Sequence, residues 1–154
     1  MKVLDARMAG AIATLGGIGN APLAPGTVAS LLVALALYPL ARHQLALWTA
    51  VLAVGALSVV ASGAHASRMR VRDPHSVVID EAFGMGLAMV LAPARPAGLA
   101  GLAAVFLLFR IFDVLKPPPL KFLERLPDGW GITADDLGAA LYSVAFLRMA
   151  GLIW

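Results

Sequence analysis

Five apolar stretches, each interrupted by small or charged residues, alternate with more polar segments along the chain. They cover residues 28–41, 45–61, 77–93, 97–115 and 137–154. A helix needs about 20 residues, and at least about 17, to cross the hydrocarbon core of a bilayer. The second, fourth and fifth stretches reach this length, whereas the first, with 14 residues, is marginal.

Two further segments are ambiguous as membrane helices. The stretch 77–93 carries Asp80 and Glu81 near its start, so it is either a span that begins at the interface or a half-buried helix. Residues 8–25 are rich in glycine and proline and only mildly apolar, which favours an interfacial or re-entrant segment. The pattern therefore predicts an all-α fold: a multi-pass transmembrane bundle of about four to five membrane helices, preceded by this N-terminal segment.

The composition agrees with a membrane protein. The chain has 154 residues, the size of one domain, and we expect residues 1–154 to form a single membrane-embedded unit. Hydrophobic residues make up 60% of it and charged residues 14%, against about 45–50% and about 25% in soluble domains. This composition excludes a disordered chain and disfavours a nucleic-acid binder. Because the chain has no cysteine, thiolate nucleophiles, iron–sulfur clusters and cysteine-bound zinc are also excluded.

The charged residues are distributed unequally between the two sides of the membrane if all five stretches cross it. Three basic residues lie on the side opposite the N-terminus: Arg42, Arg95 and Arg148. Nine lie on the side of the N-terminus, which the positive-inside rule makes cytoplasmic: Lys2, Arg7, Arg68, Arg70, Arg72, Arg110, Lys116, Lys121 and Arg125. All nine acidic residues fall on this same side, although acids contribute little to orientation. We interpret the acids as parts of a site.

Three pieces of the chain converge on that side: the start of the third predicted helix, the end of the fourth and the start of the fifth. Arg110, Asp113 and Lys116 are spaced by three and share one broad helix face, and Pro117 ends the helix directly after Lys116. Ionisable residues at membrane depth cost about 2.5–3.5 kcal/mol each, so they usually face a functional interior. The complete set is Asp80, Glu81, Arg110, Asp113, Lys116, Asp135 and Asp136.

These residue types suit phosphate chemistry with a metal ion. Carboxylates without cysteine, and with few histidines, favour Mg²⁺ or a similar hard cation over zinc. Arginine offers two parallel donors to phosphate oxygens, and lysine offers a point charge. A divalent metal on carboxylates, beside Arg and Lys, is the minimal set for phosphoryl chemistry.

Each acidic group also has a purely structural interpretation. Asp135 and Asp136 could serve only to stabilise the positive, N-terminal end of a helix dipole, with Thr133 as the N-cap. Asp80 and Glu81 could be an ordinary helix start, and Asp113 could only neutralise a neighbouring cation. His75 is most simply a solvated loop residue. A purely structural role for all the acids at once is the less economical hypothesis, because it does not explain why they lie on one side of the membrane.

Four sequence blocks, in order, resemble the phosphatidylglycerophosphatase A family of bacterial membrane lipid phosphatases. They are PLAPGTVAS at 22–30, VVIDEAFGM at 77–85, FRIFDVLKPPP at 109–119 and DGWGITADDLGA at 128–139. The resemblance extends from Gly16 to about Ala140. Asp128 and Ala29 depart from it, since both stand where glycine is expected.

The resemblance implies Mg²⁺-dependent hydrolysis of phosphatidylglycerophosphate to phosphatidylglycerol and phosphate, in the bacterial inner membrane with the active site facing the cytoplasm. In the mechanism that we expect, Asp80, Asp135 and Asp136 bind the metal and Glu81 is a ligand or the general base. Asp113 helps to hold the ion or its water, and Arg110 and Lys116 bind the terminal phosphate and stabilise the transition state. Thr27 is a further candidate for substrate binding.

Two other classes of protein would use similar residues. A lipid phosphotransferase would also use aspartates and Mg²⁺, but its DGxxAR…GxxxDxxxD pattern is missing. A small cation or solute transporter would need ionisable groups spread through the bilayer, whereas these gather at one interface. We expect the phospholipid substrate and the bilayer as partners, with no nucleic acid and no obligate protein partner.

Overall fold

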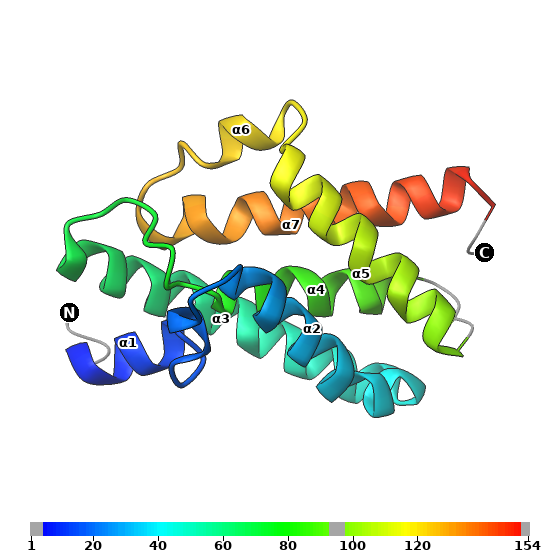
Figure 1. The fold of residues 1–154 in the computed structure, drawn as a ribbon, viewed down its shortest axis with the longest axis horizontal. Helices are drawn as coiled ribbons and strands as arrows, with labels where there is room; N and C mark the ends of the chain where they lie inside the picture. Colours follow the sequence, from blue (N-terminus) through cyan, green and yellow to red (C-terminus); the bar gives the residue numbers. More distant parts are fainter. Residues whose placement is uncertain (1–4, 93–97, 152–154) are drawn as a thin grey trace.

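The computed structural model describes residues 5–92 and 98–151, and within these residues the chain forms helices and no strands. The prediction of an all-α fold is therefore confirmed. Some residues named in the predictions lie outside the described part of the chain: Lys2, Arg95, and residues 93, 97 and 152–154 of the apolar stretches. The elements (Figure 1) are α1 (Ala6–Ala13), η1 (Ile18–Asn20), α2 (Pro25–Leu37), η2 (Tyr38–Arg42), α3 (Gln44–Met69), α4 (Ile79–Leu91), α5 (Gly98–Leu115), α6 (Leu120–Leu123) and α7 (Asp128–Met149).

Three helical segments of the described chain are long and apolar enough to cross a membrane: Pro25–Arg42, α3 and α5. The first predicted stretch was marginal in length because hydropathy alone limited it to residues 28–41. In the structure α2 begins at Pro25 and continues into the 3₁₀ helix η2, which together supply 18 residues. Pro39 lacks an amide hydrogen, which explains why the α-helical ladder gives way to η2 at this point.

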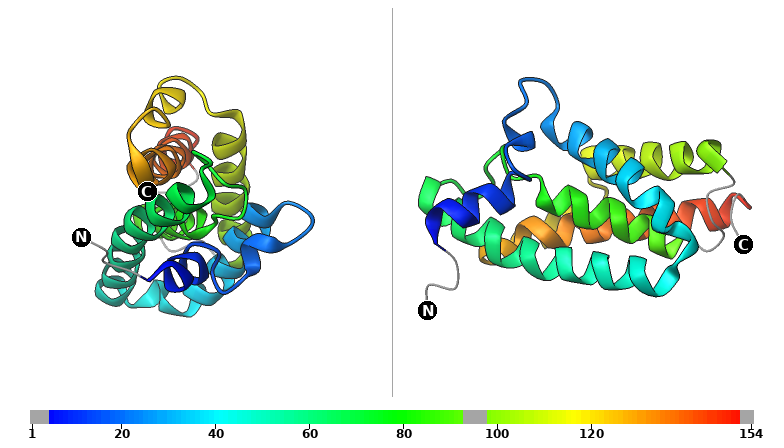
Figure 2. Two further views of the ribbon diagram at one scale, coloured as in Figure 1. Left: turned by 90° about the vertical axis from the view of Figure 1, so that its left-hand side faces the viewer. Right: turned by 90° about the horizontal axis from the view of Figure 1, so that it is seen from below.

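The helices α4 and α7 form the centre of the molecule. α4 packs against α2, α3, α5 and α7, and nearly all of its side chains are buried. The third apolar stretch forms a helix of 13 residues that is buried among its neighbours, more deeply than a half-buried helix would be. α7 begins at Asp128, nine residues before the predicted stretch 137–154, and it packs against α3, α4, α5 and α6. In the right-hand view of Figure 2 these long helices lie along the molecule, with α1 at one end.

Glycine allows the central helices to approach closely. A Cβ atom on Gly129 of α7 would lie 1.9 Å from the carbonyl oxygen of Val59 in α3, and one on Gly63 would lie 2.8 Å from the Gly129 amide nitrogen. Between α4 and α5, a Cβ atom on Gly84 would lie 2.7 Å from the Phe109 ring. Backbone-to-backbone contacts of this kind are typical of membrane helices, whose association depends on packing rather than on the hydrophobic effect.

The N-terminal segment folds back on the end of α3. α1 packs against α3 and α4, and the Val78 amide donates a hydrogen bond of 2.9 Å to the Ala13 carbonyl. The turn after α1 places Gly19 against the backbone of Ser76, where a Cβ atom would lie 1.9 Å from the Ser76 carbonyl oxygen. These two contacts hold the loop between α3 and α4, which precedes Asp80, in a fixed position.

The contact between Gly129 and α3 predicts a strong effect of adding one methyl group. We expect Gly129→Ala to destabilise the chain by about 1–3 kcal/mol, because the Val59 backbone must move to admit it. Ser67→Ala, at an exposed position of α3, should change stability by less than about 0.5 kcal/mol. Thermal unfolding in detergent, followed by circular dichroism, measures both. Equal Tm values for G129A and S67A would show that the α3–α7 contact is looser than described.

Candidate active site

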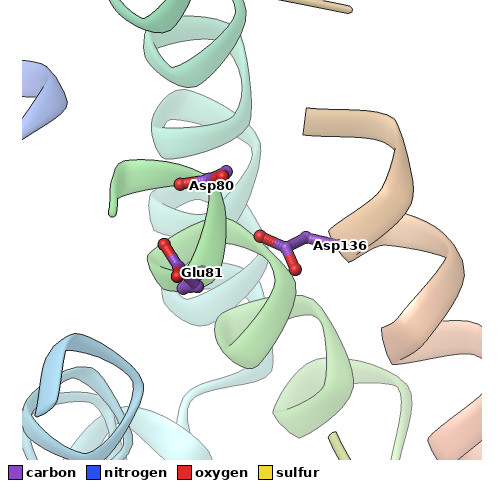
Figure 3. Close-up of side chains that lie close together, drawn as sticks. All are labelled: Asp80, Glu81 and Asp136. Carbon is purple, nitrogen blue, oxygen red and sulfur yellow. The ribbon is translucent and has the colours of Figure 1, made fainter. Parts of the chain in front are cut away.

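Four segments supply the polar side chains predicted from the sequence. Asp80 and Glu81 lie in the first turn of α4, Arg110 and Asp113 lie near the end of α5, and α7 contributes Asp135 and Asp136. Lys116 follows α5 directly. Asp136 points across to the first turn of α4 (Figure 3), and one carboxylate oxygen from each of Asp80, Glu81 and Asp136 lies within 4.8 Å of the others.

The structural interpretation of Asp135 and Asp136 as helix-start residues is wrong. The N-cap of α7 is Pro127, and the two aspartates lie beyond the first turn, where the helix dipole no longer explains them. Thr133 is not an N-cap either. It lies inside α7, and its hydroxyl forms a buried hydrogen bond of 2.7 Å with the Ser58 hydroxyl of α3. α7 begins seven residues before Asp135, at Asp128.

The Arg110 guanidinium lies beside two carboxylates, Asp113 and Glu81. Its Nη1 atom lies 2.6 Å from Asp113 Oδ2 and 4.0 Å from Glu81 Oε1. Gly26, in the first turn of α2, makes this arrangement possible. A Cβ atom there would lie 1.9 Å from Glu81 Oε1 and 3.3 Å from Arg110 Nη1. The α2 start therefore packs directly on the Arg110–Glu81 pair.

Lys116 is displayed by the end of α5, as its position before Pro117 predicted. α5 ends at Leu115, and Lys116 has a φ of 44°, in the left-handed region that a non-glycine residue seldom adopts. Its Nζ atom donates hydrogen bonds to Asp135 Oδ2, at 2.6 Å, and to Glu124 Oε1. Burial disfavours the charged amine, but these two carboxylates outweigh it and raise the pKa of Lys116 above its usual value. Lys116 is therefore a permanent cation of the site.

A cavity of about 190 Å³ joins most of these groups. Pro25 and Gly26 line it, whereas Thr27 is half-buried and is not among the residues that line it. Arg110 is likewise not among the residues that line the cavity. The cavity also reaches Asp73 and His75 in the α3–α4 loop, which the sequence interpretation left out of the site. The carboxylates and the cation that line it are Asp73, Asp80, Glu81, Asp113, Lys116, Asp135 and Asp136.

Several carboxylate oxygens of the site have no partner among the described residues. Asp80 Oδ1, Glu81 Oε2, Asp135 Oδ1 and Asp136 Oδ1 are buried and accept no hydrogen bond. Burial first, and then the charge of Glu81, raises the pKa of Asp80 well above its usual value, and burial beside Asp80 does the same for Asp136. Buried carboxylates without partners are expensive unless a cation neutralises them. This donor set, all oxygen, fits a hard divalent ion.

The chain matches the family described as Phosphatidylglycerophosphatase A over residues 11–151. It is also 33% identical, over 140 residues and 87% of each chain, to a protein of Bacteroides thetaiotaomicron named "Putative phosphatidylinositol-3-phosphatase". A Haemophilus influenzae protein named Phosphatidylglycerophosphatase A is 38% identical over 77 residues, which cover 49% of this chain and 46% of that protein. No solved structure matches.

The family match indicates a phosphatase, and the long apolar helices among the described residues fit a membrane protein. The chain belongs to the phosphatidylglycerophosphatase A family, as the four sequence blocks predicted.

The unneutralised carboxylates predict how stability depends on pH when no divalent cation is present. Burial raises the pKa of Asp135 to about 6 and that of Glu81 to about 7, above the values near 4 of an unfolded chain. The folded chain then holds more protons, so its stability falls as the pH rises from about 4 through about 7. In detergent with a chelator, we expect Tm to decrease from about pH 5 to about pH 8, and Mg²⁺ to reduce the decrease. A Tm that rises over this interval in chelator would contradict the burial of these groups.

Proposed function

We propose that this chain hydrolyses the terminal phosphate of phosphatidylglycerophosphate, in a Mg²⁺-dependent reaction, to give phosphatidylglycerol and phosphate. The observation that carries the proposal is the cluster of Asp80, Glu81 and Asp136 beside Lys116 in one cavity. The family match and the name of the Haemophilus relative support the substrate. A transporter or a phosphotransferase has no comparable support.

Asp80 and Asp136 would hold the Mg²⁺ ion, with Asp135 in the same cavity and Glu81 either as a further ligand or as the general base. When bound, the ion would supply neutralisation of the phosphate charge and a lowered pKa for a water molecule. The remaining proton transfer falls to a side chain of the protein. Burial raises the pKa of Glu81 to about 7, near the value that suits a general base at neutral pH. Glu81 would accept the proton of the attacking water.

Lys116 is the cation that lines the cavity, so we assign to it the contact with the non-bridging phosphate oxygens. Glu124 and Asp135 fix its amine, which therefore needs little reorganisation during the reaction. Arg110 would hold Glu81 and Asp113 in place. Its predicted contact with phosphate would require the guanidinium to turn away from Asp113. The part of Thr27 in substrate binding stays a prediction.

We place the site at the cytoplasmic face of the bacterial inner membrane. The positive-inside count supports this orientation, because nine of the twelve basic residues fall on the side of the site. The geometry of the helices is compatible with it: α4 begins, α5 ends and α2 begins around the cavity. The diacyl tails of the substrate would remain in lipid while its phosphomonoester reaches the carboxylates.

Purified protein in detergent should release phosphate from phosphatidylglycerophosphate with Mg²⁺ and not with a chelator. A colorimetric phosphate assay measures this, with phosphatidic acid, phosphatidylinositol 3-phosphate and a water-soluble phosphomonoester as competing substrates. The phosphoinositide is included because of the name of the Bacteroides relative. Release from phosphatidylinositol 3-phosphate alone would overturn the proposed substrate, and no release from any of the four by folded protein would overturn the proposed reaction.

Asp136→Asn and Glu81→Gln should each lower kcat by about a hundredfold or more, because they remove a metal ligand or the general base. Both variants retain the size of the side chain, so the fold should persist. Asp5→Asn, at an exposed position before α1, is the matched control and should retain full activity. Near-normal turnover by either cavity variant would remove that residue from the mechanism.

A further inference from the structure

A second polar pocket, of about 450 Å³, lies on the other side of the loop that joins α3 and α4. Ser76 of this loop faces the second pocket, whereas its neighbours His75 and Val77 face the carboxylate cavity. The second pocket has the opposite electrostatic character, because none of its lining residues is acidic. Its polar lining consists of Arg7, Thr14, Asn20, His65, Arg68 and Ser76.

The two cations of this pocket have no ionic partner in the part of the chain that the structure describes, whereas the Thr14 hydroxyl accepts a hydrogen bond from the Gly17 amide and the Ser76 hydroxyl donates one to Met69 Sδ. Arg7 and Arg68 are exposed and form no ion pair with any described residue. The Nδ1 atom of His65 is buried and has no hydrogen-bond partner there, while its Nε2 atom lies 3.4 Å from the Ser76 hydroxyl. Gly10 of α1 leaves room for this ring, since a Cβ atom would lie 3.3 Å from Nδ1. Two arginines and unsatisfied neutral donors are the groups that bind a phosphate.

An apolar groove of about 400 Å³ adjoins the pocket across α1. Ala11 of α1 is exposed and lines both the pocket and the groove, so the two are adjacent. The groove runs between the two membrane helices α2 and α3, with α4 as its floor. Ala36 and Leu57 on its rim are exposed, so the groove opens towards the bilayer. Apolar side chains line it, among them Ile12, Leu15, Val33, Leu37, Val54 and Ile79.

We propose that pocket and groove together bind one anionic phospholipid: its phosphate between Arg7, His65 and Arg68, and an acyl chain in the groove between α2 and α3. The groove argues for a lipid rather than a free phosphate ion, because a free ion would leave this apolar surface unused. The absence of acidic side chains from the lining argues for an anionic headgroup, because a zwitterionic one would bring an ammonium group with nothing to pair it. This site is separate from the carboxylate cavity and does not depend on the proposed reaction.

Native mass spectrometry of the full chain, released from detergent, tests the proposal. Phosphatidylglycerol, phosphatidylcholine and inorganic phosphate are added separately, and we expect phosphatidylglycerol to remain bound preferentially. The double variant R7A/R68A should weaken phosphatidylglycerol binding roughly tenfold or more, since each basic residue contributes about a fivefold factor at an anionic lipid surface. The matched double variant R42A/R148A removes two exposed arginines outside the pocket and should bind like the unmodified chain.

A second variant tests the groove without touching the charges. Ala36→Leu fills the groove from its exposed rim and should also lower phosphatidylglycerol retention, whereas Ala103→Leu, at an exposed position of α5, should not. Circular dichroism confirms that each variant is folded. Equal retention of phosphatidylcholine, or loss of binding in R42A/R148A as large as in R7A/R68A, would overturn the proposal. So would phosphate binding that competes with the lipid while A36L has no effect, because the pocket would then hold a free anion.

Discussion

The close contact of two central helices, α4 and α7, is the constraint on which the rest of the structure depends. It buries Asp80 and Asp136 close together, and burial, followed by the charges of neighbouring carboxylates, raises the pKa of both. Such an arrangement persists only if other parts of the molecule hold it, because like charges in a medium of low dielectric repel strongly. The surrounding helices supply that support, and the unsatisfied oxygens leave a place for a cation.

The support comes mainly from small residues. Gly63 and Gly129 allow α3 to touch the backbone of α7, and Gly84 allows α4 to lie against α5. In lipid there is little hydrophobic gain in bringing helices together, so this close packing and the buried hydrogen bond between Ser58 and Thr133 carry much of the association. The helices that carry the acidic cluster are thus held together largely by contacts that are almost free of charge.

The sequence predicted the fold class and most of the charged groups, and the reasons are local. Alternation of apolar and polar stretches is enough to indicate membrane helices, and Pro117 after Lys116 is enough to end α5. What it missed depends on contacts between distant segments. Glu124 becomes a partner of Lys116 only because the chain after α5 turns back, and no spacing rule announces that.

The extent of the helices was also difficult to predict. The hydropathy pattern predicted a stretch that begins at residue 137 and so missed the start of α7. Residues 128–136 contain three aspartates, which lower the hydropathy, and are nevertheless helical. The position of α4 was left open for a similar reason, since hydropathy does not separate a helix buried in protein from one that faces lipid. Arg110 looked like a phosphate ligand by residue type. Its neighbour Asp113 follows from the spacing of three, but its proximity to Glu81 could be recognised only in three dimensions.

The contact of Gly26 with Glu81 has a mechanical consequence. α2 faces lipid along much of its length, yet its first turn rests on a carboxylate of the site without a side chain between them. Helices adapt to the thickness of the surrounding hydrocarbon by tilting. A tilt of α2 displaces Gly26 against Glu81 and, through it, Arg110. A change in bilayer thickness would therefore reach the acidic cluster through a backbone contact, with no side chain between to absorb it.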